Sequence, residues 1–385
     1  MAEIAFWCSV ALVAYAYMGY LGVLLVLSLV RDRSRKAAAR AGATPQVSFV
    51  ITAHDEEARL RAKIENTLGQ DYPAHALDII VASDCSTDRT DAIAREYAPR
   101  VRLVRLAERK GKEAAQQLAV ASATGEILVF SDVATALAPE GVTTMVEEFA
   151  DPTVGCVSSV DRFVDGGGQV SGEGAYVRYE MLLRRLESRV NSLVGLSGSF
   201  FAARRVVCQR WCPDRQSDFN TLLNAVDMGL RGVLAARSVG YYRNIADDRR
   251  EFQRKIRTVV RGIHVLAANV RLLNPLRRGT FAWQLASHKL CRWLVPYAMI
   301  AAALSNAALV GHSLFYAATF VLQCAFYAAA LLGFWTGAPA LRIPAYLVVA
   351  NLGVLIAWFR FVRGERISMW KPSDRLATLP QAGAR

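Results

Sequence analysis

Cysteine is scarce and follows no disulfide or metal-binding pattern. The 385-residue chain has seven cysteines, an odd number, and several fall inside apolar stretches. Cys208 and Cys212 lie four positions apart, but no second ligand pair with zinc spacing accompanies them. This usage argues against a disulfide framework and a zinc finger, and it is typical of a reducing compartment.

The basic residues lack the aromatic interleaving of a nucleic-acid reader. The formal net charge is +13, and the positive residues cluster beside apolar runs, at 31–40 and 249–278. This arrangement favours an anionic membrane surface and phosphate groups as partners, and no nucleic acid is expected.

The first apolar run lacks the charge order of a signal peptide. Residues 4–30 contain no charged side chain and are long enough to cross about 30 Å of hydrocarbon. The positive cluster follows this run, whereas a signal peptide carries its charges before it. The positive-inside rule therefore places the N-terminus outside and the following chain in the cytoplasm. With 53% hydrophobic residues and a mean hydropathy of +0.22, part of the chain is expected in a membrane.

Two predicted strands end in an acidic residue. The apolar run 127–130 leads to Asp132, and the run 77–83 leads to Asp84. Ligands of open α/β sheets collect at the carboxyl ends of strands, so both carboxylates are candidates for a site. Asp132 alone fits a turn-capping role equally well. The repetition of the pattern favours a functional site.

Strands and helices alternate through the first half of the chain. The order predicts an α/β fold with a doubly wound, mostly parallel sheet, which a strand at 235–242 completes. The other predicted strands are 47–52, 77–83, 101–106 and 127–130, and the helices are 56–68, 88–97, 112–122 and 219–228.

Ordered segments resemble family 2 glycosyltransferases, the inverting class with the GT-A fold. The resemblance covers nearly all of the chain and is strongest to membrane-bound members that make bacterial exopolysaccharides. Its first four segments are VSFVITAHDEE, DYPAHALDIIVASDCSTDRT, RKGKEAAQQLA and GEILVFSDVAT. It continues through YVRYEMLLRRLESRVNSLVGLSGSFFAARR, QSDFNTLLNAVDMGLRG, EFQRKIRTVVRG and SHKLCRWLVPY.

The resemblance and the apolar runs together imply a multi-pass protein of the inner, cytoplasmic membrane with a cytoplasmic catalytic domain. The expected parts are a transmembrane helix (1–30), a basic linker (31–46), a GT-A domain (47–245), basic amphipathic interfacial helices (246–290), about three membrane helices (291–363) and a basic tail (364–385).

The three C-terminal apolar runs conflict with the charge rule. Three crossings at 294–310, 314–335 and 345–362 would leave the basic tail outside. Either one run is re-entrant or interfacial, or the tail departs from the rule, and we expect a cytoplasmic tail.

The resemblance assigns donor-binding roles to acidic and basic residues. It implies that Asp55, Glu57 and Asp84 hold the nucleoside of a nucleotide sugar and that Lys112 lies near the base or phosphate. Asp55 and Glu57 also fit helix capping. Lys112 also fits a solvated charge run, and the sequence does not distinguish it from its neighbours Arg109 and Lys110.

The resemblance also implies a divalent cation, Mg²⁺ or Mn²⁺, bound by Asp132. Ala134 stands where the family usually has a second ligand, and Ala134 cannot coordinate. Asp218 would be the base that activates the acceptor hydroxyl, although Ser217 replaces the first acid of the family's pair.

Other parts of the resemblance concern the acceptor and the donor phosphates. Residues 157–201 would form the acceptor side, with glycines at 166–168. Within them, Glu180 and Glu187 fit this role and a charged surface ladder with Arg184 equally well. Arg257 or Arg261 would reach the diphosphate. The Gln and Trp of the processive synthases' Gln-x-x-Arg-Trp motif are missing beside Arg257, which argues against processivity.

Two functions follow from these patterns. The first is a membrane-bound inverting glycosyltransferase that moves a sugar from a nucleotide-sugar donor to a lipid-linked or growing saccharide. The second is a non-catalytic, glycosyltransferase-like scaffold subunit among polysaccharide export partners, which Ala134, Ser217 and Thr258 favour. The acids Asp84, Asp132 and Asp218 favour the enzyme.

Overall fold

The computed structural model describes residues 1–31, 44–164, 175–243 and 248–366. The predicted glycine loop 166–168, most of the basic linker and nearly all of the basic tail lie outside these residues.

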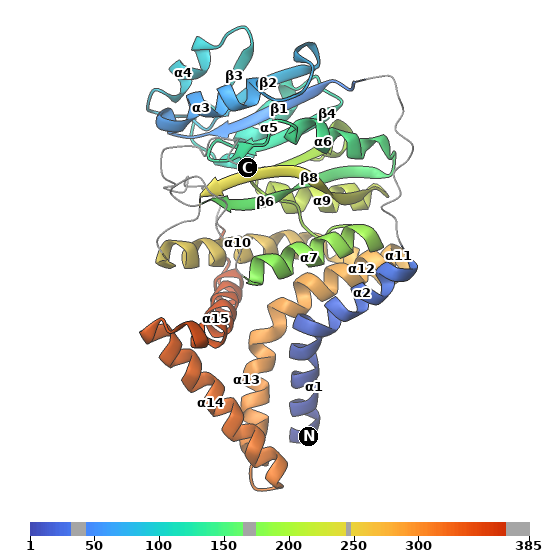
Figure 1. The fold of residues 1–385 in the computed structure, drawn as a ribbon, viewed down its shortest axis with the longest axis vertical. Coiled ribbons are helices and arrows are strands. Elements are labelled where there is room, and N and C mark those ends of the chain that lie inside the picture. Colours follow the sequence, from blue (N-terminus) through green and yellow to red (C-terminus); the bar gives the residue numbers. More distant parts are fainter. Residues whose placement is uncertain (32–43, 165–174, 244–247, 367–385) are drawn as a thin grey trace. The chain divides into compact units, whose positions relative to one another are not determined.

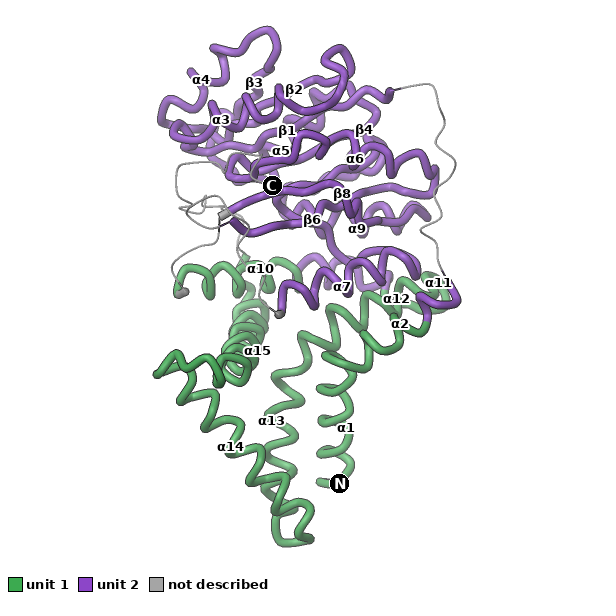
Figure 2. Tube along the Cα trace, viewed as in Figure 1, with its two compact units in different colours: residues 1–26, 249–263, 273–366 green, residues 27–248, 264–272, 367–385 purple. Residues whose placement is uncertain are grey.

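The described chain divides into two compact units (Figure 2). The helical unit contains residues 1–26, 249–263 and 273–366, and the sheet unit contains the described residues of 27–248 together with 264–272. These units divide the chain between residues 26 and 27 and between residues 248 and 249, and the predicted domain boundaries at 46 and 245 stay predictions.

The sheet unit is built on a mixed sheet of eight strands in the order β3-β2-β1-β4-β7-β6-β8-β5 (Figure 1). The strands are β1 (Val47–Ala53), β2 (Leu77–Ser83), β3 (Val101–Arg105), β4 (Ile127–Asp132), β5 (Ala136–Leu137), β6 (Val154–Val164), β7 (Phe200–Arg204) and β8 (Arg231–Arg243).

The first four strands of this order are parallel, and the remaining strands pair in both directions. β2 and β4 flank β1, and β3 pairs with β2, all in parallel. β7 runs antiparallel to both β4 and β6, while β6 and β8 are parallel. The prediction was a mostly parallel sheet, and the observed sheet is mixed, with its parallel strands gathered around β1. The carboxyl ends of these strands bring Ala53, Ser83 and Asp132 to one edge.

Helices cover both faces of the sheet because successive strand residues point to opposite sides. Phe49 and Ile51 pack into the cluster that contains side chains of α3 (Glu57–Leu68), α4 (Thr90–Glu96) and α6 (Gly141–Glu147). Val50 packs into the opposite cluster, with α5 (Lys112–Ser122), α7 (Ala175–Val190), α8 (Arg205–Cys208) and α9 (Ser217–Asp227). The short helices η2 (Ala74–Ala76) and η3 (Glu148–Ala150) complete this unit.

The helical unit is formed by both ends of the chain and most of α10. Its elements, two of which extend into the sheet unit, are α1 (Ala2–Ala14), η1 (Tyr15–Gly19), α2 (Tyr20–Val30), α10 (Asp248–Ala268), α11 (Pro275–Arg278), α12 (Thr280–Leu285), η5 (Ala286–Cys291), α13 (Arg292–Leu309), α14 (Leu314–Thr336), η6 (Pro339–Leu341) and α15 (Arg342–Val362). η4 (Val270–Leu273) links the units.

Three helices among the described residues are long and apolar enough to cross a membrane. They are Ala2–Val30, Leu314–Thr336 and Pro339–Val362. The helix α13 forms over the apolar run predicted at 294–310 but is not one of these three.

Candidate active site

Asp132 ends β4 at the edge where the parallel strands finish. Its backbone N–H donates to the carbonyl of Ser199 at 3.0 Å, and its side chain remains 23% exposed. Its Oδ1 accepts a hydrogen bond from Lys112 Nζ at 2.5 Å. The side chain thus pairs with a cation across the site, and the turn-capping alternative does not describe it.

Lys112 is the first residue of α5 and bridges two parts of the site. Its buried Nζ also donates to the carbonyl of Gly198 at 2.9 Å. Lys110 is exposed, and its Nζ lies 3.7 Å from Glu108. The structure therefore separates lysines that the sequence could not, and Lys112 is not part of a solvated charge run.

Asp84 holds the turn that presents Lys112. Its fully buried carboxylate accepts hydrogen bonds from the backbone N–H of Lys110 at 2.8 Å and of Gly111 at 3.0 Å. Gly111 has φ of +96°, which a residue with a side chain rarely adopts. Asp84 thus orients the start of α5, and with it the ammonium of Lys112.

Asp55 and Glu57 join the loops after β1 and β2. Asp55 Oδ1 accepts from the Thr87 N–H at 2.8 Å, and Glu57 Oε2 accepts from the Arg89 N–H at 3.0 Å. Burial alone would raise the pKa of Asp55, but the hydrogen bonds from Thr87 and the nearby His54 lower it below its ordinary value. The N-cap residue of α3, Glu56, makes no side-chain cap, whereas Glu57 stands in the first turn, where an acid also complements the helix dipole.

Between these two acids, Glu56 is a buried carboxyl that sequence reasoning did not single out. Burial raises the pKa of Glu56 to about 7, although Arg59 lies 2.5 Å from its Oε2 and opposes the shift. The charge of Asp132 also raises this pKa. The only sequence signal was the run of three acids at 55–57.

Asp218 lies in the first turn of α9 and is buried. Its Oδ1 accepts from the Phe219 N–H at 2.8 Å, and its Oδ2 accepts from Gln216 Nε2 at 3.2 Å. A Cβ added to Gly198 would lie 2.9 Å from Asp218 Oδ2. Gly198 therefore contacts Lys112 through its carbonyl and Asp218 through its α-carbon side, which brings both residues and Asp132 into one site.

A polar network holds the Gly198 loop. Asp161 Oδ1 accepts from Ser197 Oγ at 2.6 Å, from Ser199 Oγ at 3.1 Å and from Ser159 Oγ at 3.3 Å. Burial raises the pKa of Asp161, while Arg184 and the three hydroxyls oppose the rise. The sequence did not predict a role for Asp161, because no local motif marks a strand carboxylate whose hydrogen-bond partner, Ser197, lies 36 residues away.

The helix α7 is not the charged surface ladder that the sequence allowed. Glu187 is fully buried, and Arg184 donates to the hydroxyl of Ser158 and to the carbonyl of Gly195. Arg184 thus supports the loop that contains Gly198. An acceptor role for Glu180 and Glu187 stays a prediction.

Arg257 and Arg261 lie on α10 in the helical unit, outside the unit that contains Asp132. Both are partly buried. Their predicted contact with a diphosphate stays a prediction.

The described residues contain no group of three metal-ligating side chains. Asp132 Oδ1 is occupied by Lys112, whereas its Oδ2 accepts no hydrogen bond within the described part of the chain. One free carboxylate oxygen suits a hard divalent cation that takes its other ligands from phosphates and water. Asp132 therefore fits a cation that arrives with an anionic ligand.

Comparisons with known proteins agree with this architecture. Residues 48–211 match the family model described as Glycosyl transferase family 2. The solved structure of the mannosyltransferase PcManGT from Pyrobaculum calidifontis, in complex with GDP-Man and Mn²⁺, has a TM-score of 0.73 at 23% identity. The match covers 95% of this chain and 100% of that one. The likeness shows a shared GT-A-like α/β fold, with an N-terminal apolar helix and C-terminal apolar helices as candidate membrane spans.

Curated relatives match over shorter stretches. An N-acetylglucosaminyltransferase of Bradyrhizobium elkanii is 32% identical over 29% of this chain and 63% of its own. A beta-monoglucosyldiacylglycerol synthase of Synechocystis is 30% identical over 29% of this chain and 25% of its own. A human dolichyl-phosphate beta-glucosyltransferase is 29% identical over 23% of this chain and 31% of its own. The matches thus span less than two thirds of each relative.

Proposed function

We propose that this chain is a membrane-bound inverting glycosyltransferase. It transfers a sugar from a nucleotide diphosphate donor to a lipid-linked or growing saccharide, in the synthesis of cell-surface polysaccharide or exopolysaccharide. Its sheet unit would lie in the cytoplasm, and its apolar helices would anchor it in the inner membrane.

One arrangement carries this proposal. Lys112 Nζ bridges Asp132 and the carbonyl of Gly198, and Gly198 also contacts the carboxylate of Asp218. Lys112, the proposed cation for the leaving diphosphate, and Asp218, the proposed base for the incoming hydroxyl, therefore lie on either side of Gly198. Transfer between two bound substrates needs a base beside the attacking oxygen and a positive charge beside the leaving oxygen, on opposite sides of the reacting carbon.

The names of similar proteins support the same chemistry. The relatives include an N-acetylglucosaminyltransferase and a beta-monoglucosyldiacylglycerol synthase, and the similar structure holds GDP-Man. These proteins suggest a nucleotide-sugar donor, and some suggest a lipid acceptor. The sugar and the acceptor of this chain are left to experiment.

The proposed reaction is a single displacement at the anomeric carbon. The acceptor oxygen forms a bond to this carbon while the bond to the phosphate oxygen breaks, which inverts the configuration. Asp218 takes the proton of the acceptor hydroxyl, so that the nucleophile gains electron density as it attacks. Lys112 stabilises the negative charge that the departing diphosphate receives.

Asp132 would bind a Mg²⁺ or Mn²⁺ ion through its Oδ2. Such an ion supplies charge neutralisation for the diphosphate oxygens. Asp55 and Glu57 would contact the nucleoside, and Asp84 would act through the turn that it holds. Arg257 or Arg261 would contribute further positive charge to the donor phosphates.

A scaffold without catalytic activity is the second candidate. Ala134 provides no second cation ligand, and Ser217 replaces an acid beside Asp218. A scaffold that takes part in polysaccharide export needs neither nucleotide turnover nor Asp218.

A donor screen separates the two functions. Purified protein in lipid would be incubated with individual nucleotide sugars and candidate acceptors, and nucleotide diphosphate release would be measured with Mg²⁺, with Mn²⁺ and with chelator. Release with at least one donor, at least about 10²-fold slower in the Asp218→Asn variant, is the expected result. Failure of every donor to bind or turn over favours the scaffold.

A further inference from the structure

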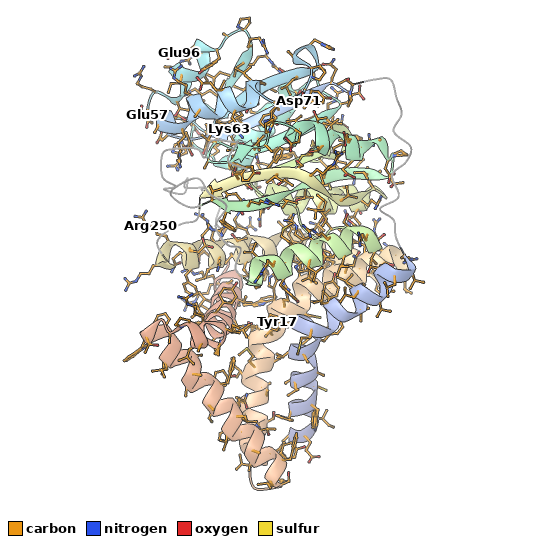
Figure 3. All side chains as sticks on the ribbon, in the orientation of Figure 1. Tyr17, Glu57, Lys63, Asp71, Glu96 and Arg250 are labelled. Atoms are coloured by element: carbon orange, nitrogen blue, oxygen red, sulfur yellow. The ribbon has the colours of Figure 1, made fainter. Side chains whose placement is uncertain are left out.

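Lys63 is a fully buried lysine that no role described above uses. It lies on α3, between this helix and the sheet, and its exposed fraction is 0% (Figure 3). Burial lowers the pKa of Lys63 to about 7, although the charge of Asp132 opposes the shift. A buried amine is unfavourable unless its hydrogen bonds are satisfied, so the two groups that accept from Lys63 show which part of the fold it stabilises.

The two acceptors flank Asp132 in the sequence. Lys63 Nζ donates to Ser131 Oγ and to the carbonyl of Thr135, each at 2.7 Å. The backbone closes the same turn, because the Thr135 N–H donates to the carbonyl of Asp132 at 3.2 Å. Ser131 and Thr135 are themselves buried, so water does not replace the lysine.

We propose that Lys63 is a positioning residue for the donor site, which holds the turn from Ser131 to Thr135 and thereby fixes the carboxylate of Asp132. This inference rests on the proposed function. Ala134 leaves the turn with a single carboxylate, so the orientation of Asp132 decides whether a diphosphate and its cation are bound. Lys63 supports the turn from the α3 side, and Lys112 contacts Asp132 from α5.

The arrangement also sets the local charge. Two amines, of Lys63 and Lys112, are near one carboxylate of Asp132, and the neighbouring Glu56 is ion-paired with Arg59. The ring of Phe49 lies 5.5 Å from Lys63 Nζ and accommodates a protonated amine. Lys112 therefore supplies the positive charge that contacts Asp132 directly, whereas Lys63 contributes hydrogen bonds to the turn from within the core.

A double-mutant cycle tests this role. Lys63→Met removes the donors and the charge and keeps an unbranched chain, and Asp132→Asn removes the carboxylate. Binding of a nucleoside diphosphate with Mn²⁺ is measured by calorimetry in the parent, both single variants and the double variant, all in lipid. Arg61→Met, an exposed position on α3 that pairs with Glu96, is the matched control.

Lys63→Met is expected to weaken binding about tenfold or more and to have little further effect when Asp132 is already Asn. A purely structural lysine would weaken binding by the same factor in both backgrounds. Additive effects, or parent affinity in Lys63→Met, overturn the proposal. If Lys63→Met does not fold, Ser131→Ala removes one acceptor and takes its place in the cycle, with the same criteria.

The test also separates this inference from the proposed function. A parent protein that binds no nucleoside diphosphate contradicts the proposed function itself. A parent that binds it and a Lys63→Met variant that binds it equally contradict only the role of Lys63. A rise in donor KM with an unchanged acceptor KM in Lys63→Met supports the assignment to the donor side.

Discussion

Asp218 Oδ2 lies so close to Gly198 that a methyl group at position 198 would come within 2.9 Å of it. The carbonyl of the same glycine accepts a hydrogen bond from Lys112. One glycine therefore sets the separation between the proposed base and the proposed phosphate-binding cation. A side chain at this position would displace the carboxylate.

Gly198→Ala should lower the transfer rate by about 10²-fold, because a displacement of about 1 Å at a reacting group has this effect. Donor affinity should change little, since the carbonyl that Lys112 contacts remains. Steady-state kinetics with varied donor would show the separation of kcat from KM. Gly69→Ala is the control, because a Cβ there meets its nearest atom at an ordinary 3.4 Å. Equal turnover in Gly198→Ala and the parent would contradict the geometry.

Asp132→Asn should abolish the cation-dependent part of nucleotide binding. The carboxylate is the protein's oxygen ligand in the proposed site, and an amide is a far weaker ligand for Mg²⁺ or Mn²⁺. Binding that remains in chelator should be as strong or stronger, because Lys112 loses its anionic partner. Titration of a nucleoside diphosphate with either ion and with chelator measures both effects. An unchanged cation dependence would exclude Asp132 as a ligand.

Glu56 should make the stability of the sheet unit fall as pH rises from about 4.5 to 7. Its pKa is raised from 4.5 to about 7 in the folded state, so over this range the folded state binds more protons than the unfolded state. The stabilisation is complete below pH 4.5 and is lost as the pH passes 7. As the pH rises from 4.5 to about 7, the thermal unfolding midpoint of the parent should therefore fall relative to that of Glu56→Gln. Parallel pH profiles would contradict a shifted Glu56.

The C-terminal tail should lie on the same side of the membrane as α10. Along α15, the ring of Tyr346 lies 5.1 Å from Lys255 of α10, and Trp358 Nε1 donates to the carbonyl of Trp293 at 2.9 Å. A Cβ on Gly353 would meet Phe252 of α10 at 3.1 Å. These contacts with a basic helix and the start of α13 favour an interfacial or re-entrant α15.

Labelling with a membrane-impermeant maleimide tests this topology in intact cells and in opened vesicles. His312→Cys, between α13 and α14, should react from outside, and Gly364→Cys should react only after opening. Subtracting the labelling of the parent accounts for its native cysteines. Labelling of Gly364→Cys from outside would instead make α15 a full crossing.

The sequence predicted the parallel half of the sheet because its strands are apolar runs that end in polar residues. The strands at 77–83 and 127–132 and the helix at 112–122 were placed within two residues of their observed ends. β6 was missed because Ser158, Ser159 and Asp161 interrupt its apolar pattern. β7 was missed because it is short and inserts antiparallel beside β4.

The sequence predicted those residues of the candidate site that stand at the end of a strand or the start of a helix. Asp84, Asp132 and Asp218 stand at such positions, and Lys112 begins a helix. Gly198, Asp161 and Lys63 contribute through partners distant in the sequence, so no local pattern marks them. Which lysine pairs with Asp132 depends on the folded arrangement of α5 and β4. For this reason the sequence could not distinguish Lys112 from Lys110.

The rate of sugar transfer by Asp218→Asn, measured beside its affinity for the donor, tests the central claim most directly. The amide keeps the shape of the side chain and cannot take the acceptor proton. A positioned base contributes about 10² to 10⁴-fold to such a rate. We therefore predict a rate at least about 10²-fold lower, with donor binding nearly unchanged and normal accumulation in the membrane. Transfer at the parent rate would contradict the account.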